Sequence, residues 1–575
     1  MDHRVVLRDA YKGYTVDQDK IYTPEETVRR FKERLKTVDL DILEGTVRID
    51  NRRLDIPIYF SVCGGDAYEI IGTKKQMGKG GTPHQSEASA VMELAERFSF
   101  FSFVKDDKNF FVEQYRNIKD RALSFDAIAR SVHDDSENLD RAAEIFSSLP
   151  LKWTWGYNIT RDKEVLIPFN WFFTINEFNG PSAGNCVEEA VLQGICEVVE
   201  RHVSSIISRN RLKTPSIDLD SATDPLVVEM IRKYRAIGAN LFISDFSLDT
   251  GIPSIGALVF DPSTFPEKSE IVWTAGTTPD PQKALSRALT EVAQLAGDFN
   301  SGSNYVASGL PKFSNLAEAD FVTRPDSVVR IASLPNLSND NIRIEVENCI
   351  ESLAKIGMEV ILVNVMNTRL QIPAFYTIVP GAHFRERAAH TSVAMFSAKM
   401  VAESSDPGWA FNELMRMDRL LSDQYFIKFF LGLTSISMNN PLGALTYFEE
   451  ALKLGPTEED IPSIYSYMGV CLKDLERYNE ALEVLEKGRY HDNERTDIHN
   501  LMGFCYFKLK EHQKAIDCFR QVLRLNPASA IDYANIASNY RDMGDIEKAV
   551  SYYQLAIELD PTIDFARENL IRLGK

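Results

Sequence analysis

The sequence contains few cysteines, and none of them has the close spacing of a zinc or redox motif. Seven cysteines are scattered over 575 residues, and no two of them form a CxxC pair. An odd number of dispersed cysteines argues against a disulfide framework and is typical of reduced thiols. We therefore expect a cytoplasmic protein.

Long hydrophobic runs are also missing. The first residues, MDHRVVLRDAYKGYTV, contain no apolar core of the kind found in signal peptides. No run of about 18 apolar residues, the length that suggests a membrane-spanning helix, occurs in the sequence. We expect no secretion signal and no membrane partner.

Positive charge is in deficit. The chain has 64 Lys and Arg against 83 Asp and Glu, a formal net charge of −19. Proteins that bind nucleic acids usually present a broad basic surface, so no nucleic-acid partner is expected. The composition, 44% hydrophobic and 26% charged, is that of an ordinary globular protein. The length suits one large enzyme domain followed by a second module.

The most informative segment is GNCVEEAVLQGICEVVERH, residues 184–202. Its apolar residues recur with the period of a helix. Asn185 has the character of an N-cap, and Glu188 completes the spacing of a capping box. The segment therefore predicts a helix that begins at Asn185.

Acidic residues recur along this helix among apolar neighbours. Glu189 and Glu200 fall nearly on one line of the helix, and Glu197 lies within about 80° of that line. Such acids need a cation, a proton or an arginine beside them. Arg201 supplies one positive charge, and a divalent metal ion is a natural source of the rest.

A second predicted helix, residues 85–103, repeats this design. Ser89, Glu93 and Glu96 share one face at i, i+4 and i+7, and Arg97 follows at once. The pattern E-x-x-E-R thus occurs in both helices. For a single helix, the alternative is a surface Glu/Arg pair worth a few tenths of a kcal/mol.

A third helix, residues 284–296, carries Arg287, Glu291 and Gln294 at the same spacing. Magnesium favours carboxylates together with phosphate oxygens and retains some of its waters. Three helices with inward-facing acids and arginines therefore predict a carboxylate-rich Mg²⁺ site for a nucleoside triphosphate.

A glycine segment, GKGGTP at residues 78–83, precedes the second helix. Its backbone N–H groups could face phosphate, although the spacing of a Walker A loop is absent. The alternative is a plain turn. The rest of residues 1–400 alternates helical and strand-like segments, which predicts a mixed α and β region.

From about residue 425 a repeat replaces this alternation. Gly469, Gly503 and Ala537 are 34 positions apart, and Ala481, Ala515 and Ala549 show the same spacing. This period is the tetratricopeptide pattern. We predict about four repeats in residues 425–575, after a helical linker at 401–424. The repeats would recruit a peptide or protein partner, or would serve for self-capping or dimerisation.

The motifs of residues 1–400 resemble those of the YcaO family. That family is recognised by an S-x-x-x-E-x-x-E-R helix, an N-x-x-x-E helix that ends in E-x-x-E-R, and a later R-x-x-x-E helix. These motifs stand here in the three helices described above. Lys20 and Thr27 match the spacing of the family's Lys and Ser near the nucleotide.

The resemblance implies an α+β YcaO-type ATP-binding domain at residues 1–400, followed by an all-α tetratricopeptide superhelix. It implies ATP and Mg²⁺ as cofactors, and a peptide or protein substrate whose backbone amide oxygen is phosphorylated. A nucleophile then attacks the amide carbon and gives an azoline, a thioamide or a related product. The implied metal residues are Glu93, Glu96, Glu189, Glu197, Glu200 and Glu291. The implied ATP-binding residues are Lys20, Thr27, Ser89, Arg97, Asn185, Arg201 and Arg287.

Two features keep another interpretation open. Azoline-forming members often end in a proline-rich segment, whereas this chain continues into repeats. A YcaO core followed by helical repeats also resembles a member that is linked to methylthiolation of a ribosomal protein. The alternative is thus an accessory or scaffold protein that binds ATP without turning over amides.

A homodimer would suit the family. Cys186 and Cys196 are expected to be ordinary small residues rather than a thiol intermediate.

Overall fold

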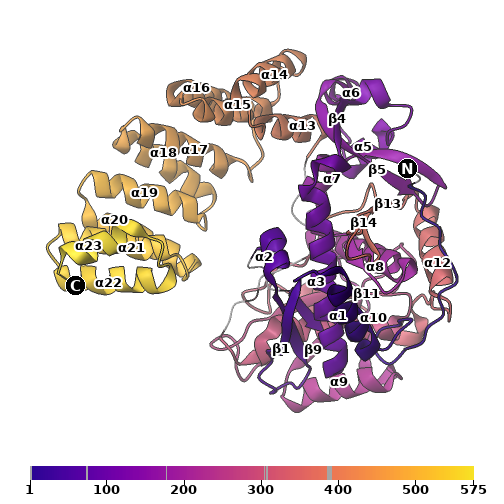
Figure 1. The fold of residues 1–575 in the computed structure, drawn as a ribbon. Coiled ribbons are helices and arrows are strands. Elements are labelled where there is room, and N and C mark those ends of the chain that lie inside the picture. Colours follow the sequence, from indigo (N-terminus) through magenta and orange to yellow (C-terminus); the bar gives the residue numbers. More distant parts are fainter. Residues whose placement is uncertain are drawn as a thin grey trace. The chain divides into compact units, whose positions relative to one another are not determined.

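A computed structural model describes residues 3–72, 76–176, 178–302, 305, 309–384 and 391–574. The chain divides into two compact units, residues 1–139 with 147–393, and residues 140–146 with 394–575. The first unit combines sheets and helices, and the second consists of successive helices (Figure 1). The predicted mixed α and β region followed by a helical region is confirmed. Within the described ranges, no helix combines the length and apolar character needed to cross a membrane.

Three sheets form the framework of the first unit. The first has the order β1-β2-β3, and the second has the order β11-β10-β9-β8-β12. The third has the order β4-β5-β13-β14-β7, with β6 paired to β5. Their strands are β1 (Leu43–Arg48), β2 (Ile58–Cys63), β3 (Gln76–Lys79), β4 (Phe111–Gln114), β5 (Pro150–Asn158), β6 (Lys163–Pro168), β7 (Pro181–Ala183), β8 (Ser216–Asp218), β9 (Asn240–Asp245), β10 (Ser254–Phe260), β11 (Val272–Thr277), β12 (Val328–Arg330), β13 (Ile361–Asn364) and β14 (Ala374–Ile378).

The antiparallel first sheet packs against α3 (Pro83–Lys105). Gly78 on β3 makes this close approach possible, because a Cβ there would lie 2.0 Å from the backbone nitrogen of Ala90 and 2.2 Å from the carbonyl oxygen of Ser86. The Ser86 hydroxyl donates a hydrogen bond of 2.7 Å to the Gly78 carbonyl. The helix α1 (Pro24–Val38) lies beside α3, and the Thr23 side chain caps its start by accepting the Glu26 N–H.

The second sheet supports α10 (Pro281–Ala296). Its strands β10 and β11 are buried along their whole length. Gly276 on β11 lets the helix approach, because a Cβ there would lie 2.5 Å from the carbonyl oxygen of Ala284. The Asp280 side chain caps α10 by accepting the Gln282 N–H, as expected for an Asp-Pro helix start.

The central helix α8 (Val187–Asn210) packs against β7, β11 and β14. Gly194 permits contact with β14, since a Cβ there would lie 2.2 Å from Thr377 Oγ1. The prediction that Asn185 caps this helix is wrong. Cys186 occupies the N-cap position without a side-chain capping bond. The Asn185 backbone and side-chain amides instead both donate to Glu189 Oε2 at 3.0 Å, so the short polar side chain is used for a local contact.

The other helices of four or more residues in this unit lie around the sheets, namely α2 (Gly65–Ile71), α4 (Tyr115–Ile118), α5 (Phe125–Ser131), α7 (Phe169–Asn176), α9 (Pro225–Ala236), α11 (Asp320–Thr323) and α12 (Ile342–Lys355). The helix α6 (Leu139–Ser148) belongs largely to the second unit. Figure 1 shows α3, α8 and α10 near the middle of the first unit. Motif residues of all three helices line one cavity.

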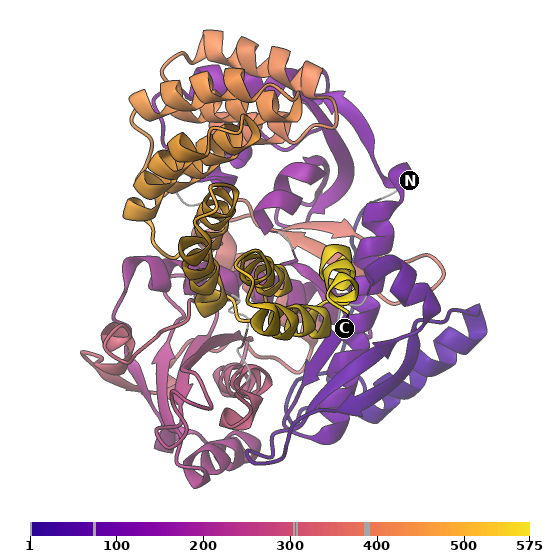
Figure 2. The ribbon, with the colours of Figure 1, turned by 90° about the vertical axis from the view of Figure 1, so that its left-hand side faces the viewer.

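The second unit is an array of helix pairs with a curved course (Figure 2). After α13 (Val393–Ala402) and α14 (Pro407–Leu420) come α15 (Tyr425–Ser437), α16 (Pro441–Lys453), α17 (Ile461–Asp474), α18 (Tyr478–His491), α19 (Thr496–Lys508), α20 (His512–Leu525), α21 (Ala530–Asp542), α22 (Ile546–Leu559) and α23 (Asp564–Arg572).

Glycines lie where the two helices of a repeat pack together. A Cβ at Gly469 would lie 2.5 Å from Leu485 Cδ2, and one at Gly503 would lie 2.7 Å from Phe519 Cε1. The small residues spaced by one repeat therefore set the distance between paired helices, as the sequence predicts.

Candidate functional site

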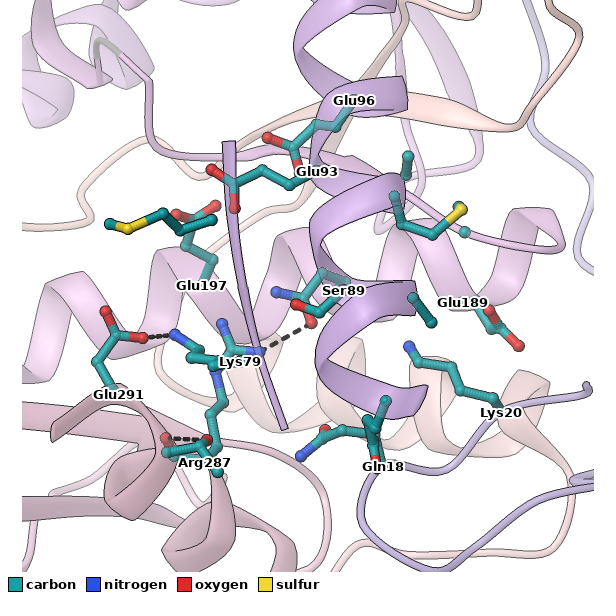
Figure 3. Close-up of a pocket in the computed structure, with 18 of the residues that line it drawn as sticks. Gln18, Lys20, Lys79, Ser89, Glu93, Glu96, Glu189, Glu197, Arg287 and Glu291 are labelled. Carbon is teal, nitrogen blue, oxygen red and sulfur yellow. Dashed lines mark hydrogen bonds and ion pairs between the residues drawn. The ribbon is translucent and has the colours of Figure 1, made fainter. Parts of the chain in front are cut away.

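The three motif helices converge on one cavity of about 630 Å³, which is within the usual size of a small-molecule site. The strand β3 and the N-terminal segment also line it. Figure 3 shows side chains from all these elements directed toward a common space. All the predicted site residues except Glu200 line this cavity. They are Lys20, Thr27, Ser89, Glu93, Glu96, Arg97, Asn185, Glu189, Glu197, Arg201, Arg287 and Glu291.

The exception is Glu200, which lies behind the cavity wall and is 2% exposed. Its carboxylate accepts a hydrogen bond of 3.2 Å from Arg287 Nε and pairs with Arg201 NH1 at 3.4 Å. It therefore neutralises two guanidinium groups that do reach the cavity. A direct role for Glu200 in metal binding stays a prediction.

The acids of α3 lie beside their own arginine. Arg97 pairs with Glu96 at 3.4 Å and with Glu93 at 3.9 Å. Burial raises the pKa of Glu93, and it raises the pKa of Glu96 well above its usual range, although Arg97 opposes both effects. A further cation in the cavity would favour the ionised form of both carboxyls.

On α8, Glu197 accepts the Gly180 N–H at 3.1 Å and lies 3.7 Å from Arg201. Arg201 in turn donates from Nε to Asn179 Oδ1 at 3.0 Å. The two E-x-x-E-R motifs thus place acids and guanidiniums side by side at the cavity wall. This arrangement can bind a polyphosphate through its arginines and a divalent cation through its carboxylates.

The N-terminal segment turns over α8 and brings Lys20 to the cavity. Tyr14 and Lys20 form an antiparallel bridge, and the Ile21 N–H donates to Glu189 Oε1 at 2.7 Å. Glu189 is therefore held by two backbone N–H groups and the Asn185 amide. The distant Lys20 joins the site through this turn.

The glycines of the segment at residues 78–83 do not line the cavity. Gly78, Gly80 and Gly81 are absent from the described lining of the cavity, and the Gly81 N–H donates to Asp17 Oδ2 at 2.7 Å. The residue that enters the cavity is Lys79. Burial lowers the pKa of its ammonium, whereas the nearby acids Glu200 and Glu93 raise it. Sequence reasoning missed Lys79 because it considered only the backbone of this segment.

Gln193 is a second residue that the motifs did not indicate. It lines the cavity from α8 and accepts a hydrogen bond of 3.0 Å from Arg287 NH1. Gln193 lies one turn after Glu189, so helical spacing from the motif is the signal that could have identified it.

The donor set fits Mg²⁺ in company with a phosphate ligand. Carboxylates, which are hard oxygen ligands, line the wall, and the positive side chains around them suit phosphate oxygens. In the described part of the chain, no three His, Cys, Asp or Glu side chains form a ready-made metal cluster.

The two cysteines of this region have the character of buried thiols. Burial raises the pKa of Cys186 and of Cys196 to about 12, and nearby acids add to the effect at Cys186. A thiol with such a pKa is a poor nucleophile, because the thiolate is the reactive form. Their interpretation as ordinary small residues therefore remains the better one.

Three histidines of the first unit stack on one another. The ring centroids of His133 and His383 are 3.6 Å apart, and the angle between the two ring planes is 1°. The ring centroid of His202 lies 5.4 Å from that of His383. The His383 N–H donates to His202 Nδ1 at 3.1 Å. Burial lowers the pKa of His202 to about 4 and that of His383 to about 3, so the stack is neutral near pH 7.

Comparison with known proteins identifies both parts of the chain. A family model described as YcaO cyclodehydratase, ATP- and Mg²⁺-binding, matches residues 77–383. Two tetratricopeptide repeat models match residues 496–529 and 533–563.

Among curated proteins, an uncharacterised protein of Methanothermobacter thermautotrophicus is 25% identical over 379 residues, which are 62% of this chain and 93% of that protein. The ribosomal protein S12 methylthiotransferase accessory factor YcaO of Escherichia coli is 30% identical over 243 residues, which are 38% of this chain and 40% of that protein.

The structure of YcaO from Methanopyrus kandleri, bound with AMPPCP and Mg²⁺, has a TM-score of 0.50 and 24% identity, and the match covers 65% of this chain and 94% of that chain. This likeness shows a common fold. The chain belongs to the YcaO family of ATP- and Mg²⁺-binding proteins, and tetratricopeptide repeats follow its YcaO domain.

Proposed function

We propose that this protein uses ATP and Mg²⁺ to phosphorylate the oxygen of a backbone amide in a peptide or protein, which prepares the amide carbon for a nucleophile. The observation that carries the proposal is the cavity itself, where carboxylates and guanidiniums from three separate helices face one space. Membership of the YcaO family supports the same activity.

ATP would supply the phosphoryl group that makes the amide oxygen a good leaving group. Catalysis of such a transfer depends mainly on positioning and on charge neutralisation. Arg97, Arg201 and Arg287 would neutralise phosphate charge, and Glu93 and Glu197 would hold Mg²⁺ directly or through water, since all five line the cavity. The remaining predicted site residues keep the roles given above as proposals.

The product is an azoline when a Cys, Ser or Thr side chain attacks, and a thioamide when sulfide attacks. We propose that the repeats at 425–575, with 401–424 as the helical linker, recruit the substrate or a partner protein. A cytoplasmic location and a homodimer remain predictions of the sequence.

The rival function is that of an ATP-binding accessory protein without amide turnover of its own. The observation that favours it is the 30% identity to the Escherichia coli accessory factor, over 38% of this chain. In that case nucleotide binding would serve the conformation or assembly of a partner complex, such as one that methylthiolates a ribosomal protein.

The first experiment is a calorimetric titration of the full-length protein with AMPPCP, with and without Mg²⁺. We expect Mg²⁺-dependent binding in the micromolar range, about −8 kcal/mol. Absence of binding at millimolar analogue would refute an ATP site in the isolated protein.

The second experiment separates the enzyme from the accessory protein. Peptides from cells that express the wild type or Glu197→Gln are compared by mass spectrometry. An enzyme gives peptides that lose water, or exchange an amide oxygen for sulfur, in the wild-type cells alone. If Mg-AMPPCP binds but the two peptide sets are identical, the accessory function is favoured.

A further inference from the structure

Lys79 is a cation in the cavity that lies outside all three motif helices. Side chains alternate along β3, so Met77 and Lys79 face the cavity while Gly78 faces α3. The tight contact between Gly78 and Ala90 holds β3 against α3. The fold therefore fixes the base of the Lys79 side chain beside α3, the helix that carries Glu93 and Glu96.

The Lys79 ammonium forms an ion pair with the Glu291 carboxylate on α10 (Figure 3). The two side chains are only 18% and 14% exposed. A carboxylate this far from solvent needs a positive partner, and here the protein supplies it. Glu291 is also one of the predicted metal ligands, so Lys79 pairs with a carboxylate that Mg²⁺ would need as a ligand.

Lys79 differs from Arg97 and Arg201 in how it is held. Arg97 and Arg201 each pair with acids of their own helix, at i−4 and i−1, and local helix geometry maintains such pairs. The pair of Lys79 with Glu291 joins a strand to a helix. A lysine ammonium is a compact charge on a flexible stem, so it can change partner without movement of the backbone.

We propose that Lys79 is an internal counter-ion. Its ammonium pairs with Glu291 in the absence of ligand, and it moves to pair with a phosphate oxygen when Mg²⁺ and a nucleotide bind together. The proposal rests on the ATP site of the proposed function. Two cations at one carboxylate repel each other at short range, so Lys79 opposes binding of the metal alone. A polyphosphate gives the displaced ammonium a new partner, so Lys79 favours metal and nucleotide together.

The test uses Lys79→Met in the full-length protein, because methionine keeps much of the stem and removes the charge. Mn²⁺ binding without nucleotide is followed by the electron paramagnetic resonance signal of the free ion. AMPPCP binding at saturating Mg²⁺ is followed by calorimetry. We expect Mn²⁺ alone to bind about tenfold more tightly and Mg-AMPPCP about tenfold more weakly than in the wild type, each about 1.4 kcal/mol.

Two further variants control the test. Lys312→Met removes a lysine from an ion pair with Glu270, 2.8 Å apart, and Lys312 is not among the residues that line the cavity. It should match the wild type in both titrations. Lys79→Arg keeps the charge and should bind Mn²⁺ alone as weakly as the wild type, even if Lys79→Met folds poorly.

The opposite signs of the two effects distinguish this role from a structural one. Damage to the fold would make Lys79→Met bind both Mn²⁺ alone and Mg-AMPPCP more weakly, and that result would overturn the proposal. Two affinities equal to those of the wild type would also overturn it. Tight binding of Mn²⁺ alone by Lys79→Arg would also overturn it. If the wild type itself fails to bind Mg-AMPPCP, the proposed function fails first.

Discussion

Glu197 and Glu200 belong to one sequence motif, yet the structure assigns them different surroundings. Glu197 lines the cavity, whereas Glu200 is buried behind it and pairs with Arg201 and Arg287. We expect Glu197→Gln and Glu200→Gln each to weaken binding of Mg-AMPPCP at least about tenfold, about 1.4 kcal/mol. The physical reasons differ, and this difference can be measured.

In Glu197→Gln the lost charge faces the cavity, so the metal is held less well. A higher Mg²⁺ concentration should therefore restore part of the affinity by mass action. In Glu200→Gln, two guanidiniums lose a buried counter-charge. Because hydrogen bonds to charged groups contribute about 1.5–3 kcal/mol, we expect this variant to lose about 2 kcal/mol of stability. Added Mg²⁺ should not restore its affinity.

The assay is calorimetric titration at two Mg²⁺ concentrations, together with a thermal unfolding scan of each variant. Glu359→Gln is the matched control, since Glu359 pairs with Arg161 at 2.8 Å and does not line the cavity. The site assignment is refuted if both Glu197→Gln and Glu200→Gln bind Mg-AMPPCP like the wild type. A Glu200→Gln variant with unchanged stability would refute the role of Glu200 as the counter-charge.

Three further outcomes are expected. Gly78→Ala should cost at least about 1–3 kcal/mol of stability and should weaken AMPPCP binding, because its Cβ would collide with Ala90, and unfolding and titration would test this. His202→Asn keeps an acceptor for the His383 N–H. Because the folded-state pKa of His202 is lowered to about 4, the free energy of unfolding of the wild type falls as the pH drops below about 6.5. In the variant, the slope of this free energy against pH should be shallower by up to about 1.4 kcal/mol per pH unit. An unaltered slope in chemical unfolding at several pH values would contradict this. Gly469→Val should lower the calorimetric unfolding temperature of the repeat unit and leave AMPPCP affinity unchanged, and a loss of affinity would show that the units are coupled.

Local signals in the sequence specify the helix starts at Pro24 and Pro281. Each depends on a cap and a proline within a few residues, and such contacts form in the same way in any fold. The repeat was equally readable, because each small residue that separates paired helices recurs once per repeat. At Asn185 the local signal failed, because its amides donate to Glu189 four residues later and Cys186 takes the N-cap position.

The sequence by itself determined which acids share a helix face, because the period of the helix fixes their direction. Only the tertiary structure decided which of them reach the cavity. Glu200 lies behind the wall, where Arg287 of α10 donates a hydrogen bond to it. Lys79 enters because Gly78 lets β3 approach α3. Such contacts join segments far apart in the chain, and no local spacing encodes them.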